Sequence, residues 1–143
     1  MPFFHQVANM AARRMPRVIN PTAHAVLDYT LAAGFLVMAA KFWKSRRRAA
    51  LGSLFCGSAA ITNSLLTRYP GGAFDVIDYK THGRIDAALA AMTASTPQFM
   101  GFSDEPEARF FSMQAISRTL LTGMSDFNHY SDSPEEHPLK AAS

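Results

Sequence analysis

The chain has 143 residues, the length of one ordinary domain. Apolar residues make up 48% of it and charged residues only 17%, below the share of about 25% that is typical of soluble proteins. The net charge of +3 comes from short basic groups that flank apolar segments, which indicates membrane-edge anchors and argues against a nucleic-acid-binding surface. Cys56 is the only cysteine, so an internal disulfide is excluded.

The first 19 residues carry three arginines and no acidic residue. Their apolar run is too short for a secretory signal, and the basic residues follow it instead of preceding it. We expect an interfacial amphipathic segment or a disordered one, and a cleaved organelle presequence would have a similar pattern.

Four long apolar segments follow, and all are predicted to be helices because they are rich in Ala, Leu and Met. The first begins at Asn20 and Pro21, a good cap followed by a proline, and runs to Trp43. At about 34 Å it is long enough to cross a bilayer core of about 30 Å. The other three cover roughly residues 49–66, 81–102 and 106–124. Pro97 is expected to kink or shorten the third, and residues 126–143 are predicted to be a polar, disordered tail.

Small residues recur at every fourth position of the second segment. They form two rows, one of Ala49, Ser53 and Gly57 and the other of Gly52, Cys56 and Ala60. In a membrane such rows allow helix backbones to approach closely. Trp43, Tyr69 and Tyr79 stand near predicted helix ends, where aromatic residues commonly mark the membrane interface.

An internal duplication is the strongest pattern in the chain. The segment HAVLDYTLAA, which starts at His24, returns as HGRIDAALAA, which starts at His82, at an offset of 58 residues. AITNSLLT, which ends at Thr67, also resembles AISRTLLT, which ends at Thr122, at an offset of 55 residues. We therefore predict two tandem helical hairpins, at about residues 20–70 and 78–125, within one membrane domain of residues 20–125.

Each hairpin would return the chain to its starting side, so both copies should have one orientation about an axis along the membrane normal. Equivalent side chains would then lie in two layers. The outer layer contains His24, His82, Thr67 and Thr122, and the inner layer contains Asp28, Asp86, Asn63 and Arg118. Because charged side chains in membrane helices face the bundle interior, Arg118 should pair with Asp28 or Asp86.

Three interpretations of these layers are open. The first is a buried polar network that fixes the helix register and joins the two halves. The second is a metal or haem site with His24, His82, Asp28 and Asp86 as ligands, although the charge of Arg118 would compete for the aspartates. The third is membrane-embedded catalysis or lipid head-group binding, with histidine as general base, aspartate as its orienting partner and Arg118 as an anion clamp. No nucleophile or leaving group identifies such a reaction.

The end of the third segment, TASTPQFMGFSDE, resembles the Ser-Pro-Trp signature of SPW-repeat membrane proteins, with Gln98 in place of the tryptophan. The His-x-x-x-Asp-Tyr opening at His24 and the Leu-Leu-Thr-x-Tyr end at Thr67 also resemble small bacterial four-helix membrane proteins. This resemblance covers roughly residues 18–125. It implies a four-helix membrane fold and no particular activity, because the family has no agreed one.

The sequence therefore predicts an all-α, four-helix transmembrane bundle in a bacterial or organelle inner membrane. Its expected partners are the lipid bilayer and other membrane subunits or further copies of itself, without nucleic acid. The predicted role is structural, as an assembly or accessory subunit without a cofactor or enzymatic activity. The alternatives are a metal or haem site and a lipid head-group enzyme. A soluble helical bundle also stays open, because the second and fourth segments are only modestly apolar.

Overall fold

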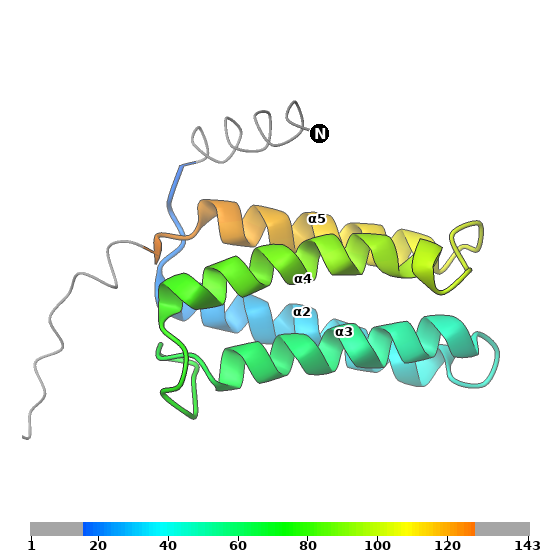
Figure 1. The fold of residues 1–143 in the computed structure, drawn as a ribbon, viewed down its shortest axis with the longest axis horizontal. Helices are drawn as coiled ribbons and strands as arrows, with labels where there is room; N and C mark the ends of the chain where they lie inside the picture. The colour runs from blue at the N-terminus through cyan, green and yellow to red at the C-terminus, as the bar shows by residue number, and fades with distance from the viewer. Residues whose placement is uncertain (1–15, 128–143) are drawn as a thin grey trace, which may run out of the picture.

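The computed structural model describes residues 16–127, which contain four α-helices and no β-strand beyond two isolated bridges (Figure 1). The helices are α2 (Pro21–Phe42), α3 (Arg47–Leu65), α4 (Tyr79–Phe99) and α5 (Ala108–Met124). The all-α, four-helix prediction is therefore confirmed for these residues. Most of the predicted N-terminal segment and most of the predicted polar tail lie outside the described residues.

The four helices form a closed ring. α2 packs against α3 and α5, and α4 packs against the same two helices. α2 and α4 begin, and α3 and α5 end, at the same end of the bundle, which is the left end in Figure 1. The chain thus consists of two antiparallel hairpins, α2 with α3 and α4 with α5, laid side by side in one orientation.

α2 and α4 begin with equivalent caps. Asn20 Oδ1 accepts a hydrogen bond from the Ala23 N–H at 2.8 Å, and Asp78 Oδ1 accepts one from the Thr81 N–H at 2.7 Å. Each cap provides an acceptor for an N–H group that has no partner within the helix. The backbone hydrogen bond from Thr81 also holds the pKa of Asp78 below its usual range.

The segment around Pro97 ends helix α4. α4 continues through Pro97 and stops two residues later at Phe99. Gly101 then adopts φ of +73°, a left-handed conformation that glycine adopts at little cost, and the Phe102 N–H bonds to the Pro97 carbonyl at 2.8 Å. The expected shortening of this helix is therefore explained by the Pro97 and Gly101 pair.

The small residues of α3 provide close packing inside the bundle. Both predicted rows are buried. A Cβ added at Gly57 would lie 2.8 Å from Phe35 Cβ of α2, and one added at Gly52 would lie 2.9 Å from Thr96 Cγ2 of α4. These two rows therefore serve contacts within one chain and are not available for association with another subunit.

Only α2, among the described helices, is long and apolar enough to cross a membrane, and a buried core helix of a soluble protein would meet the same criterion. α4 and α5 carry ionisable side chains such as His82, Asp86 and Arg118, and these lower their average hydropathy although they face the interior. The four transmembrane spans therefore stay a prediction.

Candidate functional site

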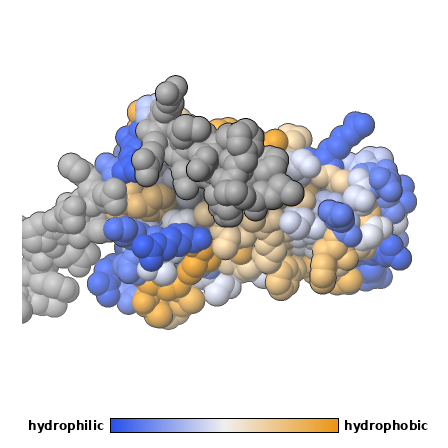
Figure 2. Space-filling view, turned by 45° about the horizontal axis from the view of Figure 1, so that its top comes forward, coloured by the Kyte–Doolittle hydropathy of each residue, from blue (hydrophilic) through white to orange (hydrophobic). Residues whose placement is uncertain are grey.

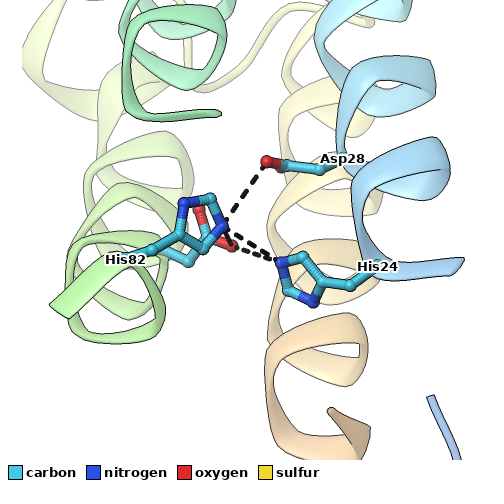
Figure 3. Close-up of side chains that lie close together, drawn as sticks. His24, Asp28 and His82 are labelled. Atoms are coloured by element: carbon cyan, nitrogen blue, oxygen red, sulfur yellow. Dashed lines mark hydrogen bonds and ion pairs between the residues drawn. The ribbon is translucent and has the colours of Figure 1, made fainter. Parts of the chain in front are cut away.

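A cluster of ionisable side chains is buried near the end of the bundle where α2 and α4 begin. His24 and Asp28 of α2 and His82 and Asp86 of α4 have no exposed surface, and Arg118 of α5 is 2% exposed. Figure 3 shows His24 and His82 pointing toward each other from opposite helices, with Asp28 one turn along from His24. We call these five residues the central cluster.

Arg118 joins the two hairpins. Its Nη1 donates to Asp28 Oδ1 at 2.6 Å and to Asp86 Oδ1 at 2.8 Å, so it pairs with both aspartates where the sequence predicted one of them. Asn63 Nδ2 also donates to Asp86 Oδ1 at 3.1 Å, and the Ser64 hydroxyl donates to Asp28 Oδ2. Each carboxylate is thereby fixed by protein donors, and Ser64 was not among the residues expected here.

Each histidine is held at its Nδ1 by a hydroxyl group. His82 Nδ1 lies 2.8 Å from Thr67 Oγ1, and His24 Nδ1 lies 2.6 Å from Ser125 Oγ. The Thr67 hydroxyl also lies 2.5 Å from the Asn63 carbonyl, and that of Ser125 lies 2.6 Å from the Leu121 carbonyl.

The sequence predicted Thr122 in the outer layer with His24. In the structure the hydroxyl next to His24 Nδ1 is that of Ser125. Thr122 makes no hydrogen bond to the cluster, and its Oγ1 has no hydrogen-bond partner among the described residues. Ser125 and Thr67 are 58 residues apart, as are His24 and His82, so one offset relates both pairs. The offset of 55 that aligned Thr122 with Thr67 is therefore wrong by three residues.

Backbone contacts fix this common offset. Ile19, just before α2, forms a parallel bridge with Ser125 at the end of α5, and Ile77, just before α4, forms one with Thr67 at the end of α3. Both isoleucines precede their histidines by five residues. The equivalent of Arg118 at this offset is Ala60 and not Asn63, although the Arg118 side chain contacts the two aspartates of its predicted layer.

The ε-nitrogens of the two histidines converge on one carboxylate oxygen. His24 Nε2 and His82 Nε2 lie 3.1 Å apart, and each lies 3.2 Å from Asp86 Oδ2. Asp28 Oδ2 is 3.6 Å from His82 Nε2 (Figure 3). One ligand atom from each of the four residues lies within 4.8 Å of every other. His24 therefore contacts the aspartate of the other hairpin, whereas His82 lies near both aspartates.

The hydrogen-bond partners assign the protons of both rings. A carbonyl oxygen only accepts, so the hydroxyl protons of Thr67 and Ser125 point to their carbonyl partners. Nδ1 of each histidine must then donate to the hydroxyl oxygen. When both imidazoles are neutral, each has this single N–H, so both Nε2 atoms present lone pairs. In that state the two Nε2 atoms and Asp86 Oδ2 are three acceptors, which a proton or a metal ion would bridge.

Three aromatic side chains surround the histidines. Tyr69 and Tyr79 are 5% and 2% exposed, and their rings stack at 5.7 Å, so they do not mark a membrane interface as predicted. Burial raises the pKa of Tyr69 above its usual range. Phe127 packs 5.5 Å from the His24 ring and belongs to the segment that was predicted to be a disordered tail. Its position in a polar sequence gave no signal of this contact.

The geometry of the central cluster disfavours the haem interpretation and is compatible with a small metal ion. The two Nε2 atoms are too close for a porphyrin plane to fit between them in this arrangement. The objection that Arg118 competes for the aspartates does not apply to a small cation, because Arg118 binds Oδ1 of each carboxylate and leaves Oδ2 toward the histidines.

Comparisons of the chain with known protein families, characterised proteins and solved structures give no match. The resemblance to SPW-repeat membrane proteins therefore stays a prediction that rests on its short motifs.

Proposed function

We propose that the chain is a small integral membrane protein that holds one divalent transition-metal ion in the central cluster. The observation that supports the metal is the triangle of His24 Nε2, His82 Nε2 and Asp86 Oδ2, with sides of 3.1, 3.2 and 3.2 Å. Metal–ligand bonds of about 2.0–2.1 Å in a tetrahedral site place neighbouring ligand atoms about 3.3 Å apart. The spacing of the cluster is close to that value.

A proton in place of the metal is the competing arrangement. Protonation of one imidazole would create an ion pair with Asp86, whose Oδ2 lies 3.2 Å from each Nε2, within the distance of a hydrogen bond. Metal analysis of the purified protein distinguishes the two arrangements.

The surroundings of the ligands support a metal of the zinc, iron or manganese type. Two imidazoles and two carboxylates suit first-row divalent ions, whereas Ca²⁺ prefers six to eight oxygens and Cu(I) prefers sulfur. Metal-bound histidines usually donate their other N–H to a fixed acceptor, as His24 and His82 do to Ser125 and Thr67. Four protein ligands without exposed surface are typical of a structural site, in keeping with a non-enzymatic role.

The membrane location is supported by where the charges and the apolar side chains lie. Five ionisable groups are buried in the central cluster, while large apolar residues of the helix surfaces, such as Val37, Phe55 and Met113, are more than 60% exposed. Figure 2 shows hydrophilic residues toward both ends of the visible face and apolar residues between them. In a bilayer, apolar side chains on the helix surfaces contact lipid, and ionisable groups of the membrane helices face the bundle interior.

The metal is tested by loading the detergent-purified protein with Co²⁺ and measuring the metal-to-protein ratio and the visible absorption spectrum. We expect about one ion per chain, and loss of binding in His24→Ala and in His82→Ala. Ser125→Ala should weaken binding by about 10–100-fold, because the second partner of a metal-bound histidine fixes its orientation. The matched control Thr122→Val should bind as the wild type does.

Absence of stoichiometric metal, or equal binding in the histidine variants, would overturn the metal proposal. In that case the second candidate, a purely structural network in an assembly or accessory subunit, would be supported by lower thermal stability of the same variants. The observation that favours this candidate is Arg118, which bonds to an aspartate from each hairpin.

The location is tested by fractionating cells that express the full chain. We expect the protein in the membrane pellet, resistant to alkaline carbonate extraction, and released only by detergent. Recovery from the high-speed supernatant without detergent would contradict the membrane proposal and support a soluble metal-binding bundle.

A further inference from the structure

Two neighbouring cavities on the surface of α4 and α5 have complementary character. The first, of about 360 Å³, is lined by three basic residues, Arg17, Lys80 and Arg84, and among the described residues by no carboxylate. The second, of about 590 Å³, runs between α4 and α5 and is lined almost entirely by apolar or small side chains. We call them the basic pocket and the apolar groove.

The two cavities are continuous. Ala87, Thr122 and Gly123 line both of them. The groove is hollow because α4 contributes only alanines to it, from Ala87 to Ala94, along a rise of about 10 Å. Thr119 bonds its hydroxyl to the Ala115 carbonyl of its own helix, so its methyl group is left for the groove.

The cations of the basic pocket are not held in close ion pairs among the described residues. Arg17, Lys80 and Arg84 are exposed and lie in no salt bridge of residues 16–127, although Arg84 is near enough to Asp78 to contribute to the lowered pKa of that carboxyl. Lys80 and Arg84 lie one turn apart near the start of α4, and Arg17 precedes α2 at the same end of the bundle. Basic pockets at this position next to membrane helices suit anionic lipid head groups.

We infer that the basic pocket and the apolar groove together bind one anionic phospholipid. The phosphate lies among Arg17, Lys80 and Arg84, and one acyl chain runs along the alanines of α4 toward the middle of the bundle. Thr122 lines both cavities and lies where they meet. This inference depends on the membrane part of the proposed function and not on the metal.

The test uses the full chain in a neutral detergent and counts bound lipid by native mass spectrometry. Phosphatidylglycerol and phosphatidylcholine with the same acyl chains are the two probes. We expect about one phosphatidylglycerol per chain, bound in preference to phosphatidylcholine. Lys80→Gln with Arg84→Gln should weaken phosphatidylglycerol binding roughly 30-fold, because each cation near an anionic lipid contributes about a fivefold gain. The control Lys41→Gln with Lys44→Gln, at the other end of the bundle, should change it less than twofold.

A second pair of variants tests the groove. Ala91→Phe fills it and should lower binding of both lipids at least tenfold, whereas Ala88→Phe, on the same helix outside the groove, should not. Equal affinity for the two lipids, or equal weakening by the control pair, would contradict the inference and indicate unspecific attraction. If Ala91→Phe changes the oligomeric state and no lipid is retained, the groove is an interface between copies and the inference is wrong. Membrane fractionation and metal content are measured separately. Failure of the proposed function is therefore distinguishable from failure of the lipid inference.

Discussion

Arg118→Leu is expected to lower the free energy of unfolding of the metal-free protein by about 3–5 kcal/mol. Arg118 Nη1 bonds to Asp28 and Asp86, which have no exposed surface, so its removal leaves two buried carboxylates without their cation. The loss is measured by chemical unfolding in detergent, followed by circular dichroism. Arg109→Leu is the control, because Arg109 is an exposed arginine on the same helix and should change stability by less than about 0.5 kcal/mol.

A triple variant identifies the cause of that loss. Asp28→Asn and Asp86→Asn, added to Arg118→Leu, remove the carboxylates that the single variant leaves uncompensated. We expect the triple variant to recover most of the lost stability, since replacing a buried ion pair entirely is far less costly than breaking it. A triple variant no more stable than Arg118→Leu would show that packing of the arginine stem, and not charge, determines the effect.

The arrangement of the four helices could be predicted because it depends on local sequence patterns and on the even number of helices in each repeat. Asn20 and Pro21 mark the start of α2 by cap chemistry alone. The spacing of His24 and Asp28, repeated at His82 and Asp86, places polar groups on one face of each helix. Two hairpins in one orientation then bring these faces to the same end of the bundle.

The partner of His24 could not be predicted, because it depends on backbone pairing outside the helices. The Leu-Leu-Thr match that suggested Thr122 is between residues common in any apolar helix. The true register follows from the bridges of Ile19 with Ser125 and of Ile77 with Thr67, and neither bridge has a pattern in the sequence.

The choice between a structural network and a metal site also lies beyond the sequence. It depends on which oxygen of each aspartate Arg118 occupies and on which nitrogen of each imidazole carries the proton. Arg118 leaves Oδ2 of Asp28 and Asp86 toward the histidines, and the hydroxyls of Thr67 and Ser125 take both Nδ1–H groups. The sequence specifies neither of these atomic assignments.

Removal of the metal by a chelator is expected to lower the free energy of unfolding by about 4 kcal/mol, if the free metal is initially present at a thousand times its Kd. The physical reason is that the ion binds the folded bundle, in which four ligands from two hairpins converge, and not the separated hairpins. Unfolding is measured with and without chelator for the wild type, His24→Ala and His82→Ala. A chelator effect as large in these variants as in the wild type would contradict the proposed ligands.

The two aspartates should respond differently in the same measurement. Asp86 Oδ2 lies 3.2 Å from both Nε2 atoms, whereas Asp28 Oδ2 lies 3.6 Å from one of them and accepts a hydrogen bond from Ser64. Asp86→Asn should therefore remove nearly all of the stabilisation by metal, and Asp28→Asn should remove a smaller part. Each substitution removes one negative charge that Arg118 neutralises. The stability that each variant loses in the metal-free state is therefore the reference against which its stabilisation by metal is measured. The reverse order would mean that Asp28 moves to become the closer ligand when the ion binds.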